Sequence, residues 1–532
     1  MSSNYDGPPI QSNLPKPWEE EVTFNDVLYD WMDRAPFLAI ALLIHVLAFF
    51  GLNMFPWEIF EKKEEIIIQA GLPTVIEEPF EELEEEEPEE LEEEVIEDPI
   101  VEDTEVVEET TDVVENDSNL PEAPFENTSG FNDAIGLGGG AGGGGGGGGG
   151  RRAGRKRIGE GINKALLAGL EWLKDHQSDD GSWDVDGFAD YCDKDGELCN
   201  GEGDELHDVG VTGLALLAFL GFGDTMKEGQ YKDVITRGVK WLQQQQDSDT
   251  GLIGDDIGTE YIYNHAIATL ALAEALYGAP NPILKPKVQK AVNYILKARD
   301  PYLAWRYSYP SDGENDTSIT GWMVFALKAA KEAKCKVPED AFRGAVSWFN
   351  EVTDESGVTG YIDRGGLSSR PEAFKDAFPS EETHAMTAVA VLCRIFAADV
   401  LEEDIEKDEL IALGADRLLE KLPVWDSGGG GGGDSGWQEG DAGASNDMYY
   451  WYYGSYAMFQ MDIVDTDYWK KWKKSMESAI LQNQRTSPPC YEGSWDPGGP
   501  WGYSGGRVYS TALMVLCLEV YFRYGKVLGA RG

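Results

Sequence analysis

The sequence predicts an all-α fold for residues 161–525, an (α/α)6 toroid of six outer–inner helix pairs, preceded by one transmembrane helix and a disordered linker. Helical periodicity recurs about every 45–70 residues after residue 160. Each repeat places an amphipathic helix before one that is apolar on nearly all faces, as inner helices are. Neither terminal pair has the polar face of a solenoid cap, so closure into a ring is the arrangement that buries every apolar face.

Residues 1–34 form a polar N-terminal segment, and residues 35–57, APFLAIALLIHVLAFFGLNMFPW, are predicted to be a transmembrane helix. A spanning helix needs about 20 apolar residues. No small-residue cleavage site follows, which disfavours a cleaved signal peptide. Trp31 and Trp57 lie at the ends of the span, as interfacial aromatics do. We expect a single-pass protein of the cell (inner) membrane with an extracytoplasmic toroid, although the basic residues flanking the span are balanced.

His45 lies in the middle of the span, where a polar ring costs free energy unless it meets a partner. It is either tolerated at a helix–helix contact or contacts a proton-conducting membrane partner. The span resembles the anchors of TonB-type energy transducers, which combine one N-terminal span containing a His, a Pro/acid-rich arm and an extracytoplasmic domain. Ala41 departs from that pattern, which has a Ser one turn before the His. The resemblance covers the anchor and the layout, and implies energy transduction or envelope scaffolding as an alternative function.

Residues 58–135 are predicted to be a disordered acidic arm, because like charges at this density keep a chain extended. Residues 136–160 form a Gly-rich linker with a basic cluster, RRAGRKR, that contacts either the acidic arm or anionic lipid. Residues 1–150 carry 37 Asp and Glu against 4 Lys and Arg, and the remainder carries 60 against 39. Both parts repel nucleic acid, so no nucleic-acid partner is expected.

The first predicted pair is ALLAGLEWLKDHQSDDGSWD (165–184) followed by HDVGVTGLALLAFLG (207–221). Five further outer helices each precede an apolar inner helix. The inner stretches are YNHAIATLALAEALYG, DTSITGWMVFALKAA, THAMTAVAVLCRIFAA, DMYYWYYGSYAMFQM and GGRVYSTALMVLCLEVYFRYG.

The stretch AGLEWLKDHQSDDGSW (168–183) has the pattern small–x2–Trp–Leu–x3–Gln–x3–Gly–x–Trp, and degenerate copies follow, the last being Gln484 with EGSWDP. It resembles the QW repeat of squalene and terpenoid cyclases, whose α/α barrels are shared with protein prenyltransferase β subunits. The resemblance spans roughly residues 161–525 and implies the toroid fold, but this fold hosts several functions. We expect Gln177 to cap the end of an outer helix, and Trp183 and Trp495 to serve stability.

The inner-helix N-termini are the predicted site, because parallel inner helices bring them to one end of the ring. Asp208 and Asp316 suit N-cap positions there. His and Arg do not suit a helix N-terminus, where the dipole is positive, so they indicate either a ligand pocket or a self-satisfied polar plug. The candidate ligand-binding residues are His207, Asp208, Asn264, His265, Asp316, Trp322, His384, Tyr450, Tyr453, Arg507 and Tyr509.

No metal and no cofactor are predicted. Prenyltransferase β subunits bind zinc through Asp, Cys and His near this end of the barrel, but no Cys here falls at an inner-helix start. Cys192 and Cys199 have six residues between them rather than the two to four of usual zinc pairs. These two thiols can pair locally, but buried free thiols are the expectation for most of the six Cys.

Class II cyclases protonate their substrate with the middle acid of Asp-x-Asp-Asp. In GENDT (313–317), Asp316 and Thr317 match the end of that motif, and the donor position is Asn315, whose amide is not a usable acid. The favoured function is therefore a membrane-anchored toroid that binds a polar or anionic ligand (a small molecule, peptide, glycan or lipid-derived group) without the standard class II cyclase acid. The alternative is an enzyme of the terpenoid cyclase or prenyltransferase type. Such an enzyme would be a cyclase, isomerase or transferase that acts on isoprenoid or other lipid substrates.

Overall fold

A computed structural model describes residues 151, 158–192, 198–370, 375–426, 446–462 and 464–523. The chain divides into two compact units, Met1–Asp112 and Val113–Gly532, and every described residue belongs to the second. The predicted transmembrane helix, the acidic arm and His45 lie outside the described residues. Within the described part, no helix is both long and apolar enough to cross a membrane.

The described residues are helical, which confirms the all-α class; extended backbone pairs there only in two isolated bridges, Gln246 with Ile253 and Thr353 with Thr359. The outer helices are α4 (Glu160–Asp175), α6 (Lys232–Gln244), α8 (Leu284–Ala298), α10 (Asp340–Val352), α12 (Glu409–Leu418) and α14 (Thr466–Leu481). The inner helices are α5 (Asp208–Gly221), α7 (Tyr261–Gly278), α9 (Thr317–Glu332), α11 (Ala385–Leu401), α13 (Met448–Met461) and α15 (Gly502–Leu518), followed by the short α16 (Val520–Arg523).

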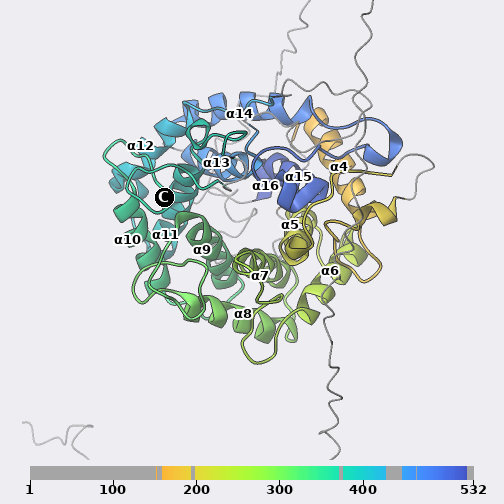
Figure 1. Ribbon diagram of the computed structural model, residues 1–532, viewed down its shortest axis with the longest axis horizontal. Helices are drawn as coiled ribbons and strands as arrows, with labels where there is room; N and C mark the ends of the chain where they lie inside the picture. The colour runs from red at the N-terminus through yellow and green to blue at the C-terminus, as the bar shows by residue number, and fades with distance from the viewer. Residues whose placement is uncertain are drawn as a thin grey trace, which may run out of the picture. The chain divides into compact units, whose positions relative to one another are not determined.

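The inner helices of this unit form a ring, with the outer helices around them (Figure 1). Each inner helix packs on the next one in chain order, and α15 returns to pack on α5. Short 3-10 turns lie in the connections: η2 (Phe188–Tyr191), η3 (Glu205–His207), η5 (Ser380–Glu382), η6 (Ile405–Lys407) and η7 (Pro489–Tyr491).

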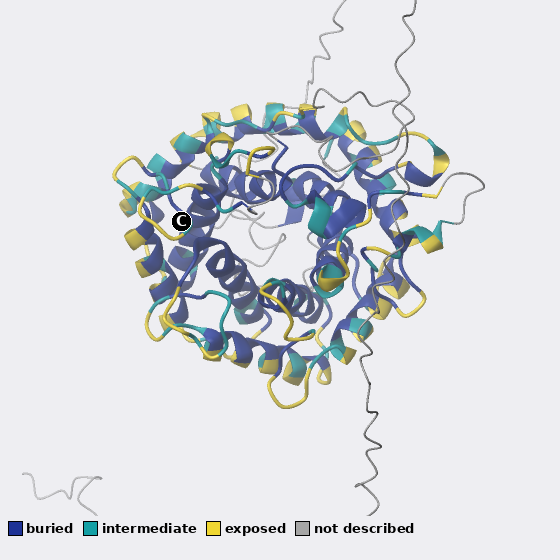
Figure 2. Cartoon of the chain, viewed as in Figure 1, coloured by how far each residue is buried: buried dark blue, intermediate teal, exposed yellow. Residues whose placement is uncertain are grey.

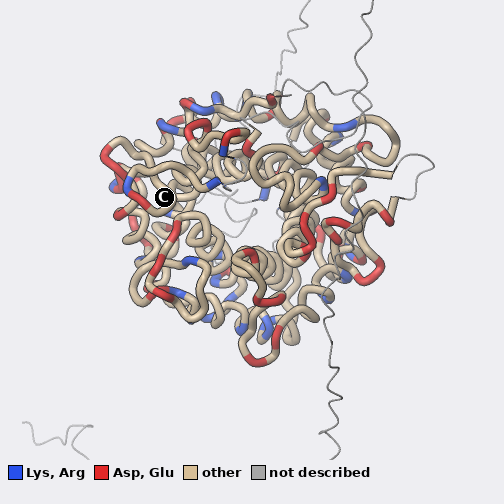
Figure 3. The backbone as a smooth tube through the Cα atoms, in the orientation of Figure 1, with Lys and Arg blue, Asp and Glu red and all other residues tan. Residues whose placement is uncertain are grey.

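Burial follows this arrangement. The outer helices are amphipathic and bury one face, so their outward sides are exposed, whereas the inner helices are buried along most of their length (Figure 2). Charged residues lie mainly on the outer helices and the connecting loops (Figure 3). An inner helix has neighbours on all sides, which explains why its sequence is apolar around the whole circumference.

The repeated tryptophans and glutamines hold the outer layer together. Trp183 donates its indole N–H to the Leu173 carbonyl (2.7 Å), and Trp495 donates to that of Ile480 (2.8 Å), which confirms their structural role. The expected cap by Gln177 on its own outer helix is wrong, because both hydrogen bonds of its amide N–H groups leave α4. Gln177 donates to the carbonyl of Gly181 in the following turn and to that of Val234 in α6, the next outer helix.

Gln484 performs the same function where the ring closes. It donates to Gly493 O (2.9 Å) in its own turn and to Ala165 O (2.7 Å) in α4, the first outer helix. The last repeat therefore binds the first through the same hydrogen bonds that join consecutive repeats.

Candidate functional site

The N-terminal ends of the inner helices lie together, as expected. In α5 the Gly210 N–H donates to Asn264 Oδ1 of α7 (3.1 Å), and Ser318 of α9 hydrogen-bonds Tyr449 of α13 through their hydroxyls (3.0 Å). These four residues all belong to the first or second turn of their helices. The predicted site residues on these helices therefore share one end of the ring.

Several of the predicted site residues hold the framework. His265 is fully buried, accepts from Ile253 N at Nδ1 (3.0 Å) and contacts Ala291 O through Nε2 (3.1 Å). Burial lowers the pKa of this histidine to about 4, so it is neutral at pH 7. Asn264 uses both ends of its amide, since Nδ2 donates to Leu206 O (2.6 Å). These hydrogen bonds give both residues a structural role.

Arg507 and Tyr450 have structural partners as well. The fully buried Arg507 binds Asp496 Oδ1 (2.7 Å) and Asn200 O (2.8 Å), and its guanidinium lies 4.6 Å from the Tyr491 ring centroid. The Tyr450 hydroxyl donates to the Leu418 and Lys421 carbonyls at the end of α12. The positive charge of Arg507 is thus already paired within the domain.

The remaining polar candidates near helix starts are partly exposed. His207, not Asp208, is the N-cap of α5, so the expected capping role of Asp208 is wrong by one residue. Asp208 Oδ1 instead accepts from Val185 N (2.9 Å). Burial, with the nearby Asp184 and Asp186 carboxylates, raises the pKa of Asp208 to about 7. His384 is the N-cap residue of α11, and its Nε2 lies 3.8 Å from Glu420 Oε2. Burial lowers the pKa of His384.

Asp316 combines a structural and a chemical feature. Its Oδ1 accepts from Ile319 N (2.7 Å), which confirms the predicted N-cap of α9. The side chain is fully buried, and Oδ2 makes no hydrogen bond with any described residue. Burial raises the pKa of Asp316 to about 7, although the Ile319 N–H, the Arg306 guanidinium and the Tyr361 hydroxyl oppose that rise. A carboxyl group with this pKa is about half protonated at pH 7, and its protonated form is able to donate a hydrogen bond.

Tyrosines surround Asp316. Its charge acts on Tyr263, Tyr307 and Tyr361, and contributes, after burial, to raising the pKa of all three phenols. Tyr307 and Tyr361 hydrogen-bond each other through their hydroxyls. The Tyr361 carbonyl also accepts from Thr317 N (3.0 Å), so the loop carrying Tyr361 is attached directly to the start of α9.

Trp322 and Tyr453 belong to an aromatic group between α9 and α13. Trp322 stacks on Tyr452 with ring centroids 5.8 Å apart, and meets Tyr453 edge-on at 5.3 Å. The buried Tyr453 hydroxyl has no hydrogen-bond partner among the described residues. Tyr509, on α15, is partly exposed and lies outside the ring contacts of this group.

A pocket of about 830 Å³ is formed by the loop between α10 and α11. Tyr361 lines it, so the pocket and the Asp316 cluster share a residue. Its charged lining residues are Asp363, Arg370, Lys375, Asp376 and Glu381. Arg370 is already paired with Asp447 (2.7 Å) inside the protein, which leaves the pocket with no excess of free positive charge.

Asn315, at the cyclase donor position, is part of the fold. Its Oδ1 accepts from Ala304 N (3.0 Å), while Nδ2 donates to Asp300 Oδ2 (3.0 Å). The buried acid of this loop is therefore Asp316, one residue later. Sequence reasoning identified Asp316 as a cap facing the site but missed Tyr307 and Tyr361, which lie in loops without periodicity. The aromatic residues of YSYP and the Tyr after VTG are the only signal that marks them.

Comparison with known proteins gives structural similarity only. No family model and no curated protein matches the chain. A cellobiose 2-epimerase from Bacillus thermoamylovorans matches with a TM-score of 0.47 and 14% identity, covering 68% of this chain and 98% of the other. A type II terpene cyclase from Scytonema gives 0.42 and 12%, covering 68% and 97%. An α-1,6-mannanase of Salegentibacter gives 0.43 and 9%, covering 68% and 99%.

None of these three matches reaches a TM-score of 0.5 or 25% identity. Neither an activity nor a substrate is carried over from them to this chain. The ring described above follows from the contacts of its own helices.

Proposed function

We propose that the chain is a single-pass membrane protein whose extracytoplasmic (α/α)6 toroid of six helix pairs binds a polar ligand at the inner-helix N-termini. The observation that carries the binding proposal is Asp316. A fully buried carboxyl group with one oxygen lacking a hydrogen bond costs free energy in the empty site, and a ligand atom removes that cost. Tyr361 connects this acid to the pocket of about 830 Å³.

The charges favour a neutral polar ligand over an anion. Arg507 is paired with Asp496 and Arg370 with Asp447, so neither guanidinium is available to an incoming carboxylate or phosphate. A protonated Asp316 donates one hydrogen bond, which matches a hydroxyl, ether or carbonyl oxygen. Among the ligand classes predicted from the sequence, a glycan, or a peptide with its carbonyl groups, fits this chemistry better than a phosphorylated lipid does.

Binding is tested with the purified full-length chain in detergent. Neutral oligosaccharides, short peptides and prenyl diphosphates are screened by the shift of the thermal unfolding midpoint. For a compound that stabilises the wild type, Asp316→Asn is expected to weaken binding about tenfold, the effect of roughly 1.4 kcal/mol. Asp312→Asn, in the exposed part of the same loop, is the matched control and should bind normally. A panel without any stabilising compound, or equal binding by both variants, would refute the proposed site.

An enzymatic function is the second candidate, and one observation favours it. The raised pKa of Asp316 suits a general acid at neutral pH, and the aromatic group of Trp322 and Tyr453 resembles a surface that stabilises a cation. Incubation of the full chain with squalene, oxidosqualene and prenyl diphosphates, followed by mass spectrometry, tests this. Products formed by the wild type and lost in Asp316→Asn would establish catalysis; unchanged substrates would leave binding alone.

The TonB-like role rests on the predicted anchor alone, and is proposed as an alternative that is compatible with ligand binding. Its test is His45→Ala in the full chain. Loss of a function that depends on the proton gradient, with membrane insertion retained, would support energy coupling. An unaffected phenotype would leave His45 as a tolerated residue of the span.

A further inference from the structure

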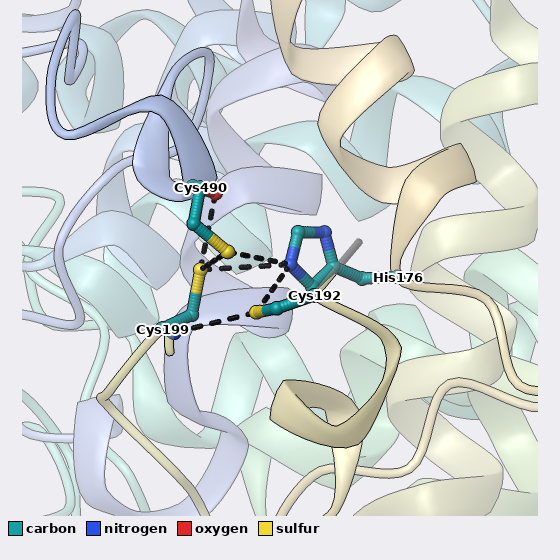
Figure 4. A group of neighbouring side chains, drawn as sticks. All are labelled: His176, Cys192, Cys199 and Cys490. Carbon is teal, nitrogen blue, oxygen red and sulfur yellow. Dashed lines mark hydrogen bonds between the residues drawn. The ribbon is translucent and has the colours of Figure 1, made fainter. Parts of the chain in front are cut away.

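Three cysteines and a histidine lie together (Figure 4), although Cys490 is 291 positions from Cys199 in the sequence. His176 follows α4, Cys192 follows η2, Cys199 lies in the loop before η3, and Cys490 belongs to η7. Their ligand atoms all lie within 4.8 Å of one another. His176 Nε2 is 3.3 Å from Cys192 Sγ, 3.5 Å from Cys199 Sγ and 3.8 Å from Cys490 Sγ.

These distances match a tetrahedral zinc site. Zn–S bonds of about 2.3 Å and Zn–N bonds of about 2.0–2.1 Å place neighbouring ligand atoms about 3.6–3.8 Å apart. Cys199 Sγ and Cys490 Sγ are 3.1 Å apart, so this pair needs to separate slightly to accept the ion. The same distance is well beyond a disulfide bond of about 2.05 Å, and all six cysteines are free thiols.

The surroundings orient the histidine for coordination. His176 Nδ1 lies 2.8 Å from the Trp172 carbonyl, a contact in which the ring nitrogen must donate. Its Nε2 therefore carries a lone pair, and this is the atom that faces the three sulfurs. Trp172 also stacks on the imidazole with centroids 4.1 Å apart. Zinc-bound histidines are typically held by such a hydrogen bond from the other ring nitrogen.

The cluster is closed to solvent on most sides. His176, Cys199 and Cys490 are each 3% exposed, and Cys192 is partly buried. The Cys199 N–H points at Cys192 Sγ (3.3 Å), which would stabilise a thiolate there. Four protein ligands leave no open position for a substrate, which is the arrangement of structural rather than catalytic zinc.

We propose that His176, Cys192, Cys199 and Cys490 bind one structural zinc ion. Three ligands come from the first helix pair and its connection, whereas Cys490 precedes the last inner helix. The ion would thus tie the beginning of the ring to its end, at the junction that Gln484 and Ala165 also bridge. On binding, the three thiols release their protons to solvent and become thiolates. The four ligands are different residues from those around Asp316, so this proposal does not depend on the proposed ligand.

The test begins with the full-length chain purified in detergent without added chelator. Elemental analysis by mass spectrometry is expected to give one zinc ion per chain. Exchange for Co²⁺ should produce the visible d–d bands of tetrahedral cobalt and thiolate-to-cobalt absorption in the near ultraviolet. Cys490→Ser should lose the zinc and shift these bands, whereas Cys335→Ser, which changes a buried thiol elsewhere in the domain, should keep both.

Thermal unfolding distinguishes a structural zinc ion from an adventitiously bound one. Chelation should lower the unfolding midpoint of the wild type and of Cys335→Ser, but not that of Cys490→Ser. If Cys490→Ser does not fold, the stoichiometry and cobalt spectrum of the wild type decide the matter by themselves. Wild-type chain without zinc that also fails to bind Co²⁺ would overturn the proposal.

A Cys199–Cys490 disulfide would overturn it as well, and mass spectrometry detects this outcome. The chain is denatured with chelator and alkylated without reductant. The zinc site predicts that all six cysteines are alkylated, because removal of the ion leaves free thiols. A disulfide protects two of them from alkylation and leaves only His176 and Cys192 of the four proposed zinc ligands.

Discussion

Asp316 shows how one residue serves both the fold and the proposed site. One oxygen caps α9 through Ile319 N, and the other has no partner among the described residues. A capping residue is ordinarily exposed and ionised, but here the loop carrying Tyr361 covers the helix start. Burial is therefore what turns a common cap into a weak acid whose pKa is about 7, so that a large fraction carries the proton near neutral pH.

This protonation predicts a pH-dependent stability. The pKa of Asp316 is about 7 in the folded chain and 3.8 in its unfolded reference, so the folded state binds the proton more tightly. Its contribution is fully present below about pH 4 and is lost as the pH rises to 7. Asp316→Asn keeps the cap and removes the titration, so its stability relative to wild type should rise between pH 5 and 8, by at most about 2.7 kcal/mol.

Denaturant unfolding at several pH values measures this difference. Asp312→Asn is the control, because Asp312 is exposed and its pKa is lowered by the Ser308 hydroxyl. Its relative stability should not rise with pH. A difference between Asp316→Asn and wild type that stays constant from pH 5 to 8 would show that Asp316 is ionised throughout.

At the scale of the helix pairs, a threonine hydroxyl of four inner helices accepts from the backbone of the turn that follows the preceding outer helix. Thr212 Oγ1 accepts from Trp183 N (2.9 Å), and Thr387 accepts from Thr359 N (3.0 Å). In the second pair His265 Nδ1 takes over by accepting from Ile253 N. Thr269 is then left fully buried with no partner for its hydroxyl among the described residues.

The repeat therefore predicts opposite outcomes for two similar substitutions. Thr212→Val leaves a buried N–H of Trp183 without its acceptor and should cost about 1–3 kcal/mol. Thr269→Val removes a hydroxyl that has no partner there and should be neutral or slightly stabilising. Denaturant unfolding of both variants beside wild type measures the difference. Equal destabilisation would mean that the hydroxyls do not support the turns.

The glutamine bridges give a second prediction at this scale. Gln484→Ala removes hydrogen bonds to Ala165 O and Gly493 O at the ring closure, and should cost about 1–3 kcal/mol. Gln244→Ala changes an exposed glutamine of α6 and should stay within about 0.5 kcal/mol of wild type. Thermal unfolding of the two variants compares them. A Gln484→Ala chain as stable as Gln244→Ala would show that this bridge does not strengthen the closure.

Helix content and the outer–inner alternation were predictable because periodicity and composition are local properties. The N-cap at Asp316 was predictable for the same reason. The sequence did not reveal that His265 replaces a threonine as the turn acceptor, since this depends on how α7 faces its neighbours. The meeting of His176 with Cys490 was equally inaccessible, because 314 positions separate them. The six residues between Cys192 and Cys199 are too many for a usual zinc pair, so this spacing, taken by itself, indicated no metal site.

At the scale of the whole domain, the end of the ring opposite the proposed site holds a buried ionic network. Glu274 of α7 accepts from Arg523 (3.0 Å) and from Arg151 (3.0 Å), and Arg523 also binds Glu519. A Cβ on Gly221 would lie 1.8 Å from Glu519 Oε2, so glycine is required there. Arg151, the described residue of the basic cluster, also donates to the Leu220 carbonyl (2.8 Å).

This network joins α5, α7 and α16 with the segment before α4, so its loss should weaken the whole ring. Glu274→Gln removes the carboxylate that binds both Arg523 and Arg151, and breaking a buried ion pair in this way typically costs about 3–5 kcal/mol. Glu355→Gln, which breaks the exposed pair with Arg364, is the control and should cost less than about 1 kcal/mol. Denaturant unfolding of the full-length variants, followed by circular dichroism, measures both. If Glu274→Gln has the same free energy of unfolding as the Glu355→Gln control, the ring stays closed without this network. Closure then rests on the hydrogen bonds of Gln484 and on the cluster around His176.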